Sequence, residues 1–271
     1  MNLLHRSFNK RKTLQITAAS CSEIGRVREQ NEDALALSDP RHEQVAQQYG
    51  YLYLLADGAG GHAAGEVASR VAVETILTAY YDQQEKGVPP DRLLRAFWLA
   101  HTRIRQLASQ HQEYAGMVTT CIAAVIEDTR LWLAHVGDSR AYLLPARSTA
   151  VPTMVCLTTD HSVAVAVAIA RGQSLEQARH APTRHMLYKA LGGEEKMDAC
   201  PDLAVQEIQA GDKVMLCCDG LWSLLTEEQM APIIARMTPQ EACTTLVRLA
   251  NEAGGNDNIS LIVLSFSERA G

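Results

Sequence analysis

Aspartates stand at the ends of apolar runs in five separate parts of the sequence. Asp57, Asp138 and Asp219 follow the runs YLYLLA, LWLAHVG and DKVMLCC, and Asp33 and Asp257 come just before ALAL and ISLIVL. Short apolar runs of this kind are typical of strands, and groups at strand ends project from a rigid scaffold. We therefore expect carboxylates from distant parts of the chain to converge on one cleft.

Converging carboxylates repel one another, and a cation between them removes the repulsion. An oxygen ligand set, without a cluster of histidines and cysteines, favours magnesium, manganese or calcium over zinc. The alternative is that each aspartate only caps a turn, where this residue is common. That alternative suits a single Asp-Gly pair, whereas the whole set beside glycine-rich segments favours a metal centre. A zinc hydrolase lacks its ligands in this sequence.

The segment DGAGGHAAGE, from Asp57 to Glu66, precedes an expected helix. Its glycines allow a backbone carbonyl to approach a metal closely. The segment has neither a GxGxxG spacing nor a following GK[ST], which excludes a dinucleotide site and a P-loop. Within it, His62 could act as a general acid, but orienting the loop or facing solvent fits this residue equally well.

Arg28 lies five residues before Asp33, and an arginine beside a metal cluster can grip a phosphate dianion with two hydrogen bonds. Taken alone, Arg28 fits a solvent-exposed surface arginine better. A hydrolase with a Ser/His/Asp triad is a competing catalytic hypothesis. However, the sequence has no GxSxG motif, and Ser139 stands between Asp138 and Arg140 without a recognisable signature.

Strand and helix patterns come in groups rather than in strict alternation. Helices are expected over 63–81 and 91–112, and capping boxes predict further helix starts at Ser174, Thr226 and Thr238. The expected strands cover 14–21, 34–37, 51–56, 118–126, 131–136, 141–144, 153–157, 203–208, 213–218 and 259–266. Consecutive helices between groups of strands do not fit a parallel β-α-β sheet. They fit two antiparallel sheets packed together, with helix pairs outside.

Composition and charge narrow the class of protein. The chain has 271 residues and a net charge of −6, without a basic field, which argues against nucleic acid as a main partner. Its seven cysteines form no CxxC pair, so a reducing, cytoplasmic location fits best. The longest apolar stretch, 163–170, is too short to span a membrane. We expect one domain over 14–267 after a frayed lead over 1–13, and a monomer.

Six segments resemble the motifs of the metal-dependent protein phosphatases of the type-2C class, in their compact bacterial form. They are GRVREQNED, LLADGAGGHAAGEVAS, AHVGDSRAYLL, LTTDHS, LCCDGLW and GGNDNISLIVL, in the order of the family. The resemblance runs from about Ile16 to Leu264. It implies an α+β fold, a four-layer αββα sandwich of two central antiparallel sheets flanked by helix pairs, with metals at one end of the sheets.

The resemblance also implies the metal ligands. Asp57 would bridge two metals, the carbonyl of Gly58 would add a ligand, and Asp219 and Asp257 would complete the coordination of the first metal.

Glu32 and Asp33 would serve the second metal, directly or through water. Asp138, helped by Asp219, would hold a third and weaker metal, so that two Mn²⁺ or Mg²⁺ ions bind tightly and a third less so. The segment from Ser162 to about Leu191, the flap, would be mobile beside the substrate channel.

The implied reaction is hydrolysis of phosphoserine and phosphothreonine monoesters in proteins. Two metals about 3.5–4 Å apart lower the pKa of a bridging water, and the resulting hydroxide attacks phosphorus in line, without a covalent intermediate. Arg28 would bind the phosphate. The partners would be phosphoproteins, with a cognate Ser/Thr kinase and its substrates in a signalling role.

Three positions depart from the family pattern. Ala59 stands where Met is usual, Val118 where Gly is usual, and Cys218 where Ser is common. None of these changes removes an implied ligand. A catalytically silent binding module with the same fold is the competing hypothesis, and turnover that a chelator abolishes would exclude it.

Overall fold

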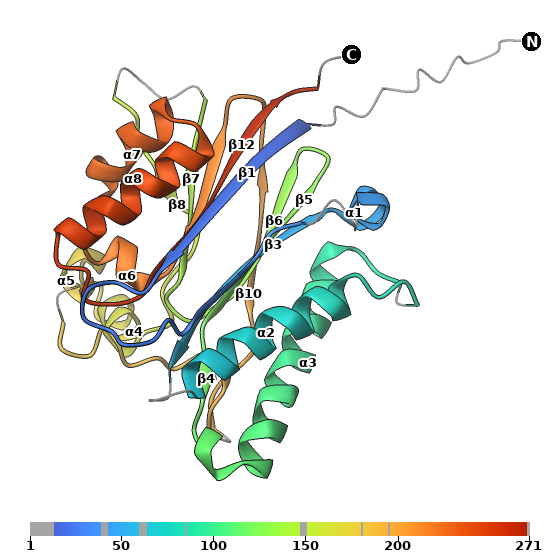
Figure 1. Cartoon of the computed structure of the whole chain (residues 1–271), viewed down its shortest axis with the longest axis vertical. Coiled ribbons are helices and arrows are strands. Elements are labelled where there is room, and N and C mark those ends of the chain that lie inside the picture. The colour runs from blue at the N-terminus through green and yellow to red at the C-terminus, as the bar shows by residue number, and fades with distance from the viewer. Residues whose placement is uncertain are drawn as a thin grey trace, which may run out of the picture.

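The chain is described by a computed structural model over residues 14–38, 43–59, 64–84, 86–146, 151–179, 181–194 and 196–269. These residues form two antiparallel sheets that lie face to face (Figure 1). The first sheet has the order β1-β12-β11-β7-β8, with the bounds Leu14–Glu23, Ile259–Glu268, Lys213–Cys217, Arg140–Leu144 and Val155–Cys156. The second has the order β10-β6-β5-β3-β4-β9, with the bounds Asp202–Glu207, Arg130–Val136, Cys121–Glu127, Tyr51–Ala59, Val118–Thr119 and Leu191–Gly192. Strand β2, Asp33–Ala36, pairs with β3.

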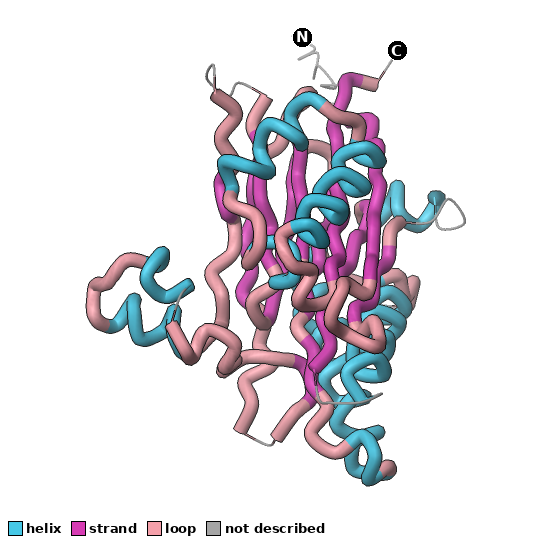
Figure 2. Tube along the Cα trace, turned by 60° about the vertical axis from the view of Figure 1, so that its left-hand side comes forward, coloured by secondary structure: helices cyan, strands magenta, loops and turns pink. Residues whose placement is uncertain are grey.

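Helix pairs cover the outer faces of both sheets. Helices α2, Ala64–Tyr80, and α3, Pro89–Gln110, pack on the second sheet, and α7, Glu227–Arg236, and α8, Pro239–Glu252, pack on the first. A third apolar cluster, which includes Leu55, Ile122, Val214 and Ile262, fills the space between the sheets. The expected four-layer αββα sandwich is therefore confirmed, and the tube in Figure 2 shows its strands between helical layers.

Side-chain caps explain several of the helix starts. Thr238 and Glu241 form the expected capping box of α8: Glu241 N donates to Thr238 Oγ1, and Thr238 N donates to a Glu241 carboxylate oxygen 3.0 Å away. The same box opens α7. At Ser174 the box is not formed as expected, because its hydroxyl accepts from Glu176 N, one position earlier than a capping box requires. A short helix, α5, Leu175–Arg179, nevertheless begins there.

The link between β5 and β6 is a tight hairpin. Glu127 pairs with Arg130, and Asp128 at the tip has a φ of 55°, which a two-residue hairpin turn requires. The expected strand over 118–126 is instead split into β4 and β5 at Thr120. Thr120 stays opposite Asp57 and its N–H donates to the Asp57 carbonyl at 2.8 Å, but the Asp57 N–H donates to the Thr120 hydroxyl instead of its carbonyl, which interrupts the ladder.

Three helices were not expected from the sequence. Helix α1, Glu43–Tyr49, is short, and α4, Val163–Ala170, is a run of eight apolar residues that gives no helical period. Helix α6, Asp219–Trp222, is a single turn directly after β11. Such short elements offer too few residues for a pattern to be recognised.

The flap contains α4 and α5, which stand apart from the sheets as a small lobe (Figure 2). Ser162 at its start forms a bridge with Leu187 near its end. Its mobility stays a prediction, and the lead over 1–13 lies outside the described residues.

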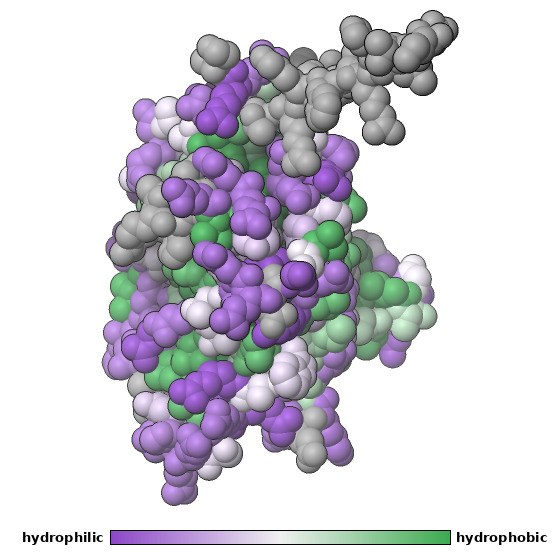
Figure 3. Space-filling model, turned by 90° about the vertical axis from the view of Figure 1, so that its right-hand side faces the viewer, coloured by the Kyte–Doolittle hydropathy of each residue, from purple (hydrophilic) through white to green (hydrophobic). Residues whose placement is uncertain are grey.

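The face over α1 to α3 is mainly hydrophilic, with hydrophobic residues in separate patches (Figure 3). Within the described residues, no helix combines the length and the apolar character that a membrane crossing needs.

Candidate functional site

A cleft of about 650 Å³ lies where β3, α6 and the segments before β2 and β12 meet. Its lining combines acidic, basic and small residues from all parts of the chain: Arg28, Glu29, Gln30, Glu32, Asp57, Gly58, Ala59, Val118, Thr120, Asp138, Arg184, His185, Leu187, Asp219, Gly220, Ser223, Leu224, Asn256 and Asp257. The expected convergence of carboxylates therefore occurs, and most of the residues singled out from the sequence share this cleft.

Among the described residues, one predicted site residue, Asp33, is not part of this lining. Asp33 is buried beneath the cleft, where its carboxylate lies within 4.8 Å of ligand atoms of Asp57 and Cys218. His62 lies outside the described residues.

Strand pairing places Asp57 opposite Asp33. The two residues are directly paired in the antiparallel ladder of β3 and β2, so both lie inside strands rather than beyond their ends. Two threonines fix the backbone of Asp57: Thr119 Oγ1 donates to its carbonyl, and its N–H donates to Thr120 Oγ1, at 2.9 and 3.1 Å. The carboxylate is thus held by a backbone whose N–H and carbonyl are both hydrogen-bonded.

Gly58 allows the start of α2 to come close to β3. A Cβ atom at this position would lie 2.1 Å from the carbonyl oxygen of Gly65 and 2.7 Å from that of Glu32. Only a residue without a side chain fits there, which explains the glycine that follows Asp57.

The side chain of Asn258 links the segment before β12 to the loop between β1 and β2, beside the cleft. Its Oδ1 accepts from Glu32 N at 2.8 Å, and its Nδ2 donates to the carbonyls of Ile24 and Gln30, both at 2.9 Å. Buried next to Asp257, it positions the loop that carries Arg28 and Glu32. The sequence interpretation took Asp257 from the GGNDN motif and missed this neighbour, although a second polar residue before a buried strand was a usable signal.

Burial and mutual repulsion raise the pKa values of several carboxyl groups in the site. Burial, followed by the charges of the neighbouring aspartates, raises the pKa values of Asp57 and Asp138 well above their ordinary range. Burial raises the pKa of Asp33 to about 7, even though Ser260 and Cys218 oppose the shift. Burial is also the main reason why the pKa of Glu32 is raised. Without a cation, this site holds its negative charge only at a cost.

Buried oxygens without partners indicate that cations fit this site. Among the described residues, neither carboxylate oxygen of Asp33 nor Oε1 of Glu32 has a hydrogen-bond partner of regular geometry. Buried polar atoms nearly always have a hydrogen-bond partner, so these three oxygens are available to coordinate a ligand. A set of carboxylates and a backbone carbonyl suits a hard divalent cation.

Cys218 is a poor candidate for a metal ligand despite its position. Burial, and then the charges of Asp33 and Asp57, raise the pKa of its thiol well above the ordinary value. The sulfur already donates to the carbonyl of Asn258 and accepts from Ser260 N, at 3.3 and 3.1 Å. A serine hydroxyl could make the same two bonds, so this departure from the family pattern preserves the local structure.

Basic residues lie on the rim of the cleft. Arg28 Nη2 is 2.7 Å from Asp257 Oδ2, and its Nη1 is 3.9 Å from Glu32 Oε2, while the side chain is 46% exposed. From the flap, Arg184 and His185 also line the cleft, and His185 Nδ1 is 3.6 Å from Asp219 Oδ2.

The two departures Ala59 and Val118 pair with each other across β3 and β4 and line the cleft. Val118 also pairs with Gly192 at the end of the flap. A side chain at Val118 is therefore accommodated beside the flap without disturbing this strand pairing.

Comparison with known proteins gives consistent matches over almost the whole chain. The family model described as Protein phosphatase 2C matches residues 17–259. The serine/threonine phosphatase stp of Listeria innocua is 32% identical over 254 residues, which covers 90% of this chain and 93% of that protein. The crystal structure of the serine/threonine phosphatase PstP/Ppp of Mycobacterium tuberculosis has a TM-score of 0.79 and 31% identity, and covers 94% of this chain and 99% of that one.

A structure of the catalytic domain of the phosphatase PstP in complex with two manganese ions is similar as well. It has a TM-score of 0.77 and 29% identity, and the match covers 94% of this chain and all of that one.

Proposed function

Since the chain belongs to the protein phosphatase 2C family and is a metal-dependent serine/threonine protein phosphatase, we propose that it hydrolyses phosphoserine and phosphothreonine monoesters at the cleft described above. The observation that carries this proposal is the convergence of buried carboxylates, some with unpartnered oxygens, beside the exposed guanidinium of Arg28. Such a site can bind multivalent cations and a phosphate dianion together.

Two cations would be held by residues of the cleft floor. Asp57 would bridge them, the Gly58 carbonyl with Asp219 and Asp257 would serve one, and Glu32 and Asp33 would serve the other, directly or through water. The two manganese ions named for the PstP catalytic domain support this number. Either Mn²⁺ or Mg²⁺ suits the oxygen ligands.

A third and weaker cation would be held by Asp138 together with Asp219. Support comes from the raised pKa of Asp138, which is due to burial first and to the charge of Asp219 second. A cation between the two carboxylates would remove that repulsion.

When bound, the cations would supply Lewis acidity to the phosphoryl oxygens and make the attacking water more acidic. Arg28 would bind the phosphate, because its exposed side chain can turn donor atoms toward the cleft while Nη2 stays near Asp257. Water would attack phosphorus in line with the leaving serine or threonine oxygen. No residue of the chain would form a covalent intermediate, and the general-acid role of His62 stays a prediction.

The substrates would be phosphoproteins, with those of a cognate Ser/Thr kinase as the natural candidates. We place the catalytic unit in one domain over 14–267, with the flap as its mobile part. All seven cysteines are free, which supports a reducing, cytoplasmic setting.

The decisive test is the substitution Asp219→Asn, assayed on a phosphothreonine peptide with Mn²⁺ or Mg²⁺. We expect kcat/KM to fall roughly 100-fold or more, the scale of losing one group that stabilises the transition state. The fold should remain, because the change removes one charge from a repelling cluster. Circular dichroism and the manganese content after dialysis would be measured alongside.

The matched control is Asp82→Asn, a half-buried aspartate after α2, far from the cleft, whose Oδ1 accepts from Gln84 N. It should keep full activity. Unchanged activity of the Asp219→Asn protein, or wild-type turnover that persists in a chelator, would contradict the site assignment.

A further inference from the structure

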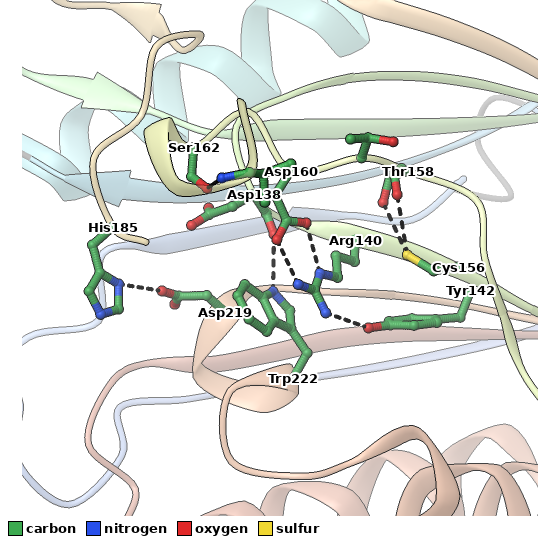
Figure 4. Close-up of polar contacts among 12 residues, drawn as sticks. Asp138, Arg140, Tyr142, Cys156, Thr158, Asp160, Ser162, His185, Asp219 and Trp222 are labelled. Carbon is green, nitrogen blue, oxygen red and sulfur yellow. Dashed lines mark hydrogen bonds and ion pairs between the residues drawn. The ribbon is translucent and has the colours of Figure 1, made fainter. Parts of the chain in front are cut away.

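Behind the cleft, a buried arginine joins the two segments that carry Asp138 and the start of the flap. Arg140 on β7 donates through Nε and Nη2 to both carboxylate oxygens of Asp160, at 2.8 and 2.6 Å (Figure 4). Its Nη1 donates to the hydroxyl of Tyr142 at 3.1 Å. Both members of the ion pair are more than nine-tenths buried. A two-pronged pair of this kind fixes distance and orientation together.

The indole of Trp222 extends this arrangement to α6. The guanidinium of Arg140 stacks on its ring at 3.5 Å, and Trp222 Nε1 donates to the backbone carbonyl of Asp138 at 3.0 Å (Figure 4). Because Asp219 is the first residue of α6 and Trp222 the last, this hydrogen bond links the element that carries Asp219 to the backbone of Asp138.

Two further contacts attach the same segment to its surroundings. His161 N donates to the Gly137 carbonyl at 2.9 Å, and Gly137 N donates to His161 Nδ1 at 3.1 Å. On the other side of Asp138, the hydroxyls of Ser139 and Thr120 are hydrogen-bonded at 2.8 Å. Asp138 thus stands in a backbone segment held by His161 just before the flap, by Thr120 between β4 and β5, and by α6.

An ion pair buried in this way is not explained by stability alone. Burial by itself would lower the pKa of Arg140, and the bonds to Asp160 reverse that effect, so the guanidinium stays charged. Well-packed apolar side chains often stabilise a protein as well as a buried pair does, and the best-attested benefit of buried polar groups is a specified geometry. Here the specified geometry belongs to Asp138, Asp219 and the first residues of the flap.

We propose that Arg140, Asp160 and Trp222 are positioning residues, which set the spacing between Asp138 and Asp219 and thereby the affinity for the weakest of the bound cations. The inference rests on the proposed function, because it assumes that these two carboxylates share a cation. None of the three side chains lines the cleft, so they act through the residues they hold.

Trp222→Phe is the sharpest variant, because it keeps an aromatic ring against the guanidinium and removes only the N–H that reaches Asp138. We expect the weakest Mn²⁺ site, measured by electron paramagnetic resonance titration of the full chain, to lose affinity roughly 2- to 10-fold, the scale of one hydrogen bond. The tighter Mn²⁺ sites should change less than about twofold, because Asp219 is only one of several ligands proposed there and the hydrogen bond reaches none of the others. The Mn²⁺ concentration for half-maximal hydrolysis of p-nitrophenyl phosphate should rise with the same ratio, while KM for the ester stays constant.

Trp132→Phe is the matched control. The indole N–H of Trp132 is buried and has no hydrogen-bond partner among the described residues, so its removal should leave all Mn²⁺ affinities unchanged. Arg140→Lys provides a second arm, since lysine keeps the charge but not the two-pronged geometry. It should weaken the same weakest site and leave the tighter ones intact.

The inference would be overturned by equal Mn²⁺ affinities in the wild-type and Trp222→Phe proteins, by parallel weakening of every site, by the same change in the Trp132→Phe protein, or by a wild-type protein without a weaker site. Binding and turnover are measured separately. A wild-type protein that binds Mn²⁺ but does not hydrolyse phosphopeptides would contradict the proposed function. The Mn²⁺ affinities of the variants would still test the positioning roles.

Discussion

Two buried carboxylates, those of Asp33 and Asp57, face each other beside the cleft. Asp33 and Asp57 are directly opposed in the ladder of β2 and β3, and like charges in that position repel. Burial raises the pKa of both groups, because the charged carboxylates lose their hydration. In the metal-free protein, protonation is therefore the available way to relieve the repulsion.

This leads to a pH prediction for the protein in a chelator. The ordinary pKa of an aspartate is 3.8, and that of Asp33 in the fold is about 7. Between these values the folded state keeps a proton that the unfolded state has lost, so the contribution to stability is complete below about pH 4 and disappears as the pH rises through 7. The free energy of unfolding of the wild type, relative to Asp33→Asn, should fall by at least about 1 kcal/mol from pH 5 to 7.5.

Urea unfolding of both proteins at each pH measures this difference. The comparison with Asp33→Asn cancels the opposite effect of His135 and His161, whose pKa values burial lowers in both proteins. A difference that stays constant or grows with pH would show that Asp33 is ionised in the folded metal-free state.

At this scale the sequence identified the carboxylates but not the residues that hold them. Asp57, Asp138, Asp219 and Asp257 could be found because apolar runs mark the strands beside them. The bond between Arg140 and Asp160 could not, since the two residues are 20 positions apart and neither has a local pattern that would reveal burial.

Among the elements, α6 shows how a single turn of helix is held in place. A Cβ atom at Gly220 would lie 1.9 Å from the carbonyl oxygen of Asn258, so α6 rests directly against the chain at the start of β12. This contact brings Asp219 and Asp257 to the same side of the cleft.

Gly220→Ala should therefore separate α6 from this backbone. We expect a loss of about 1–3 kcal/mol in the free energy of unfolding, the usual cost of overpacking, together with a fall in Mn²⁺ affinity. Thermal unfolding with and without Mn²⁺ would measure both.

Gly87→Ala is the control, because the nearest atom to a Cβ there is 3.5 Å away. Equal stability and Mn²⁺ binding in the two variants would mean that the close contact at Gly220 has no importance for the site.

The long elements could be predicted and the short ones could not. Helices α2 and α3 and the capped starts of α7 and α8 follow from apolar spacing and capping residues. Helix α4 could not be recognised, because eight consecutive apolar residues fit a helix and a strand equally well. The break at Thr120 depends on the hydrogen bond from Asp57 N to the Thr120 hydroxyl, which only the tertiary structure provides.

For the molecule as a whole, cation binding and folding should be strongly linked, since the proposed ligands lie in or beside strands of both sheets and in segments more than 200 residues apart. Mn²⁺ at about 100 times its Kd should raise the free energy of unfolding by about 2.7 kcal/mol for each site occupied. The melting temperature should rise accordingly and return to its starting value with excess chelator.

Differential scanning calorimetry over a series of Mn²⁺ concentrations measures this linkage. In the Asp219→Asn protein the rise should be smaller. A melting temperature that does not respond to Mn²⁺ in the wild type would mean that the buried carboxylates do not bind it.

Asp33 and Asp57 face each other in the pairing of β2 with β3, and both belong to the proposed metal site. On the proposed assignment, a cation bound by both carboxylates would stabilise the pairing of β2 with β3 and complete the catalytic site in one step. We therefore expect β2 to detach before any other strand when divalent ions are scarce. The inactive, metal-free enzyme would then also be the form that proteases cleave most readily.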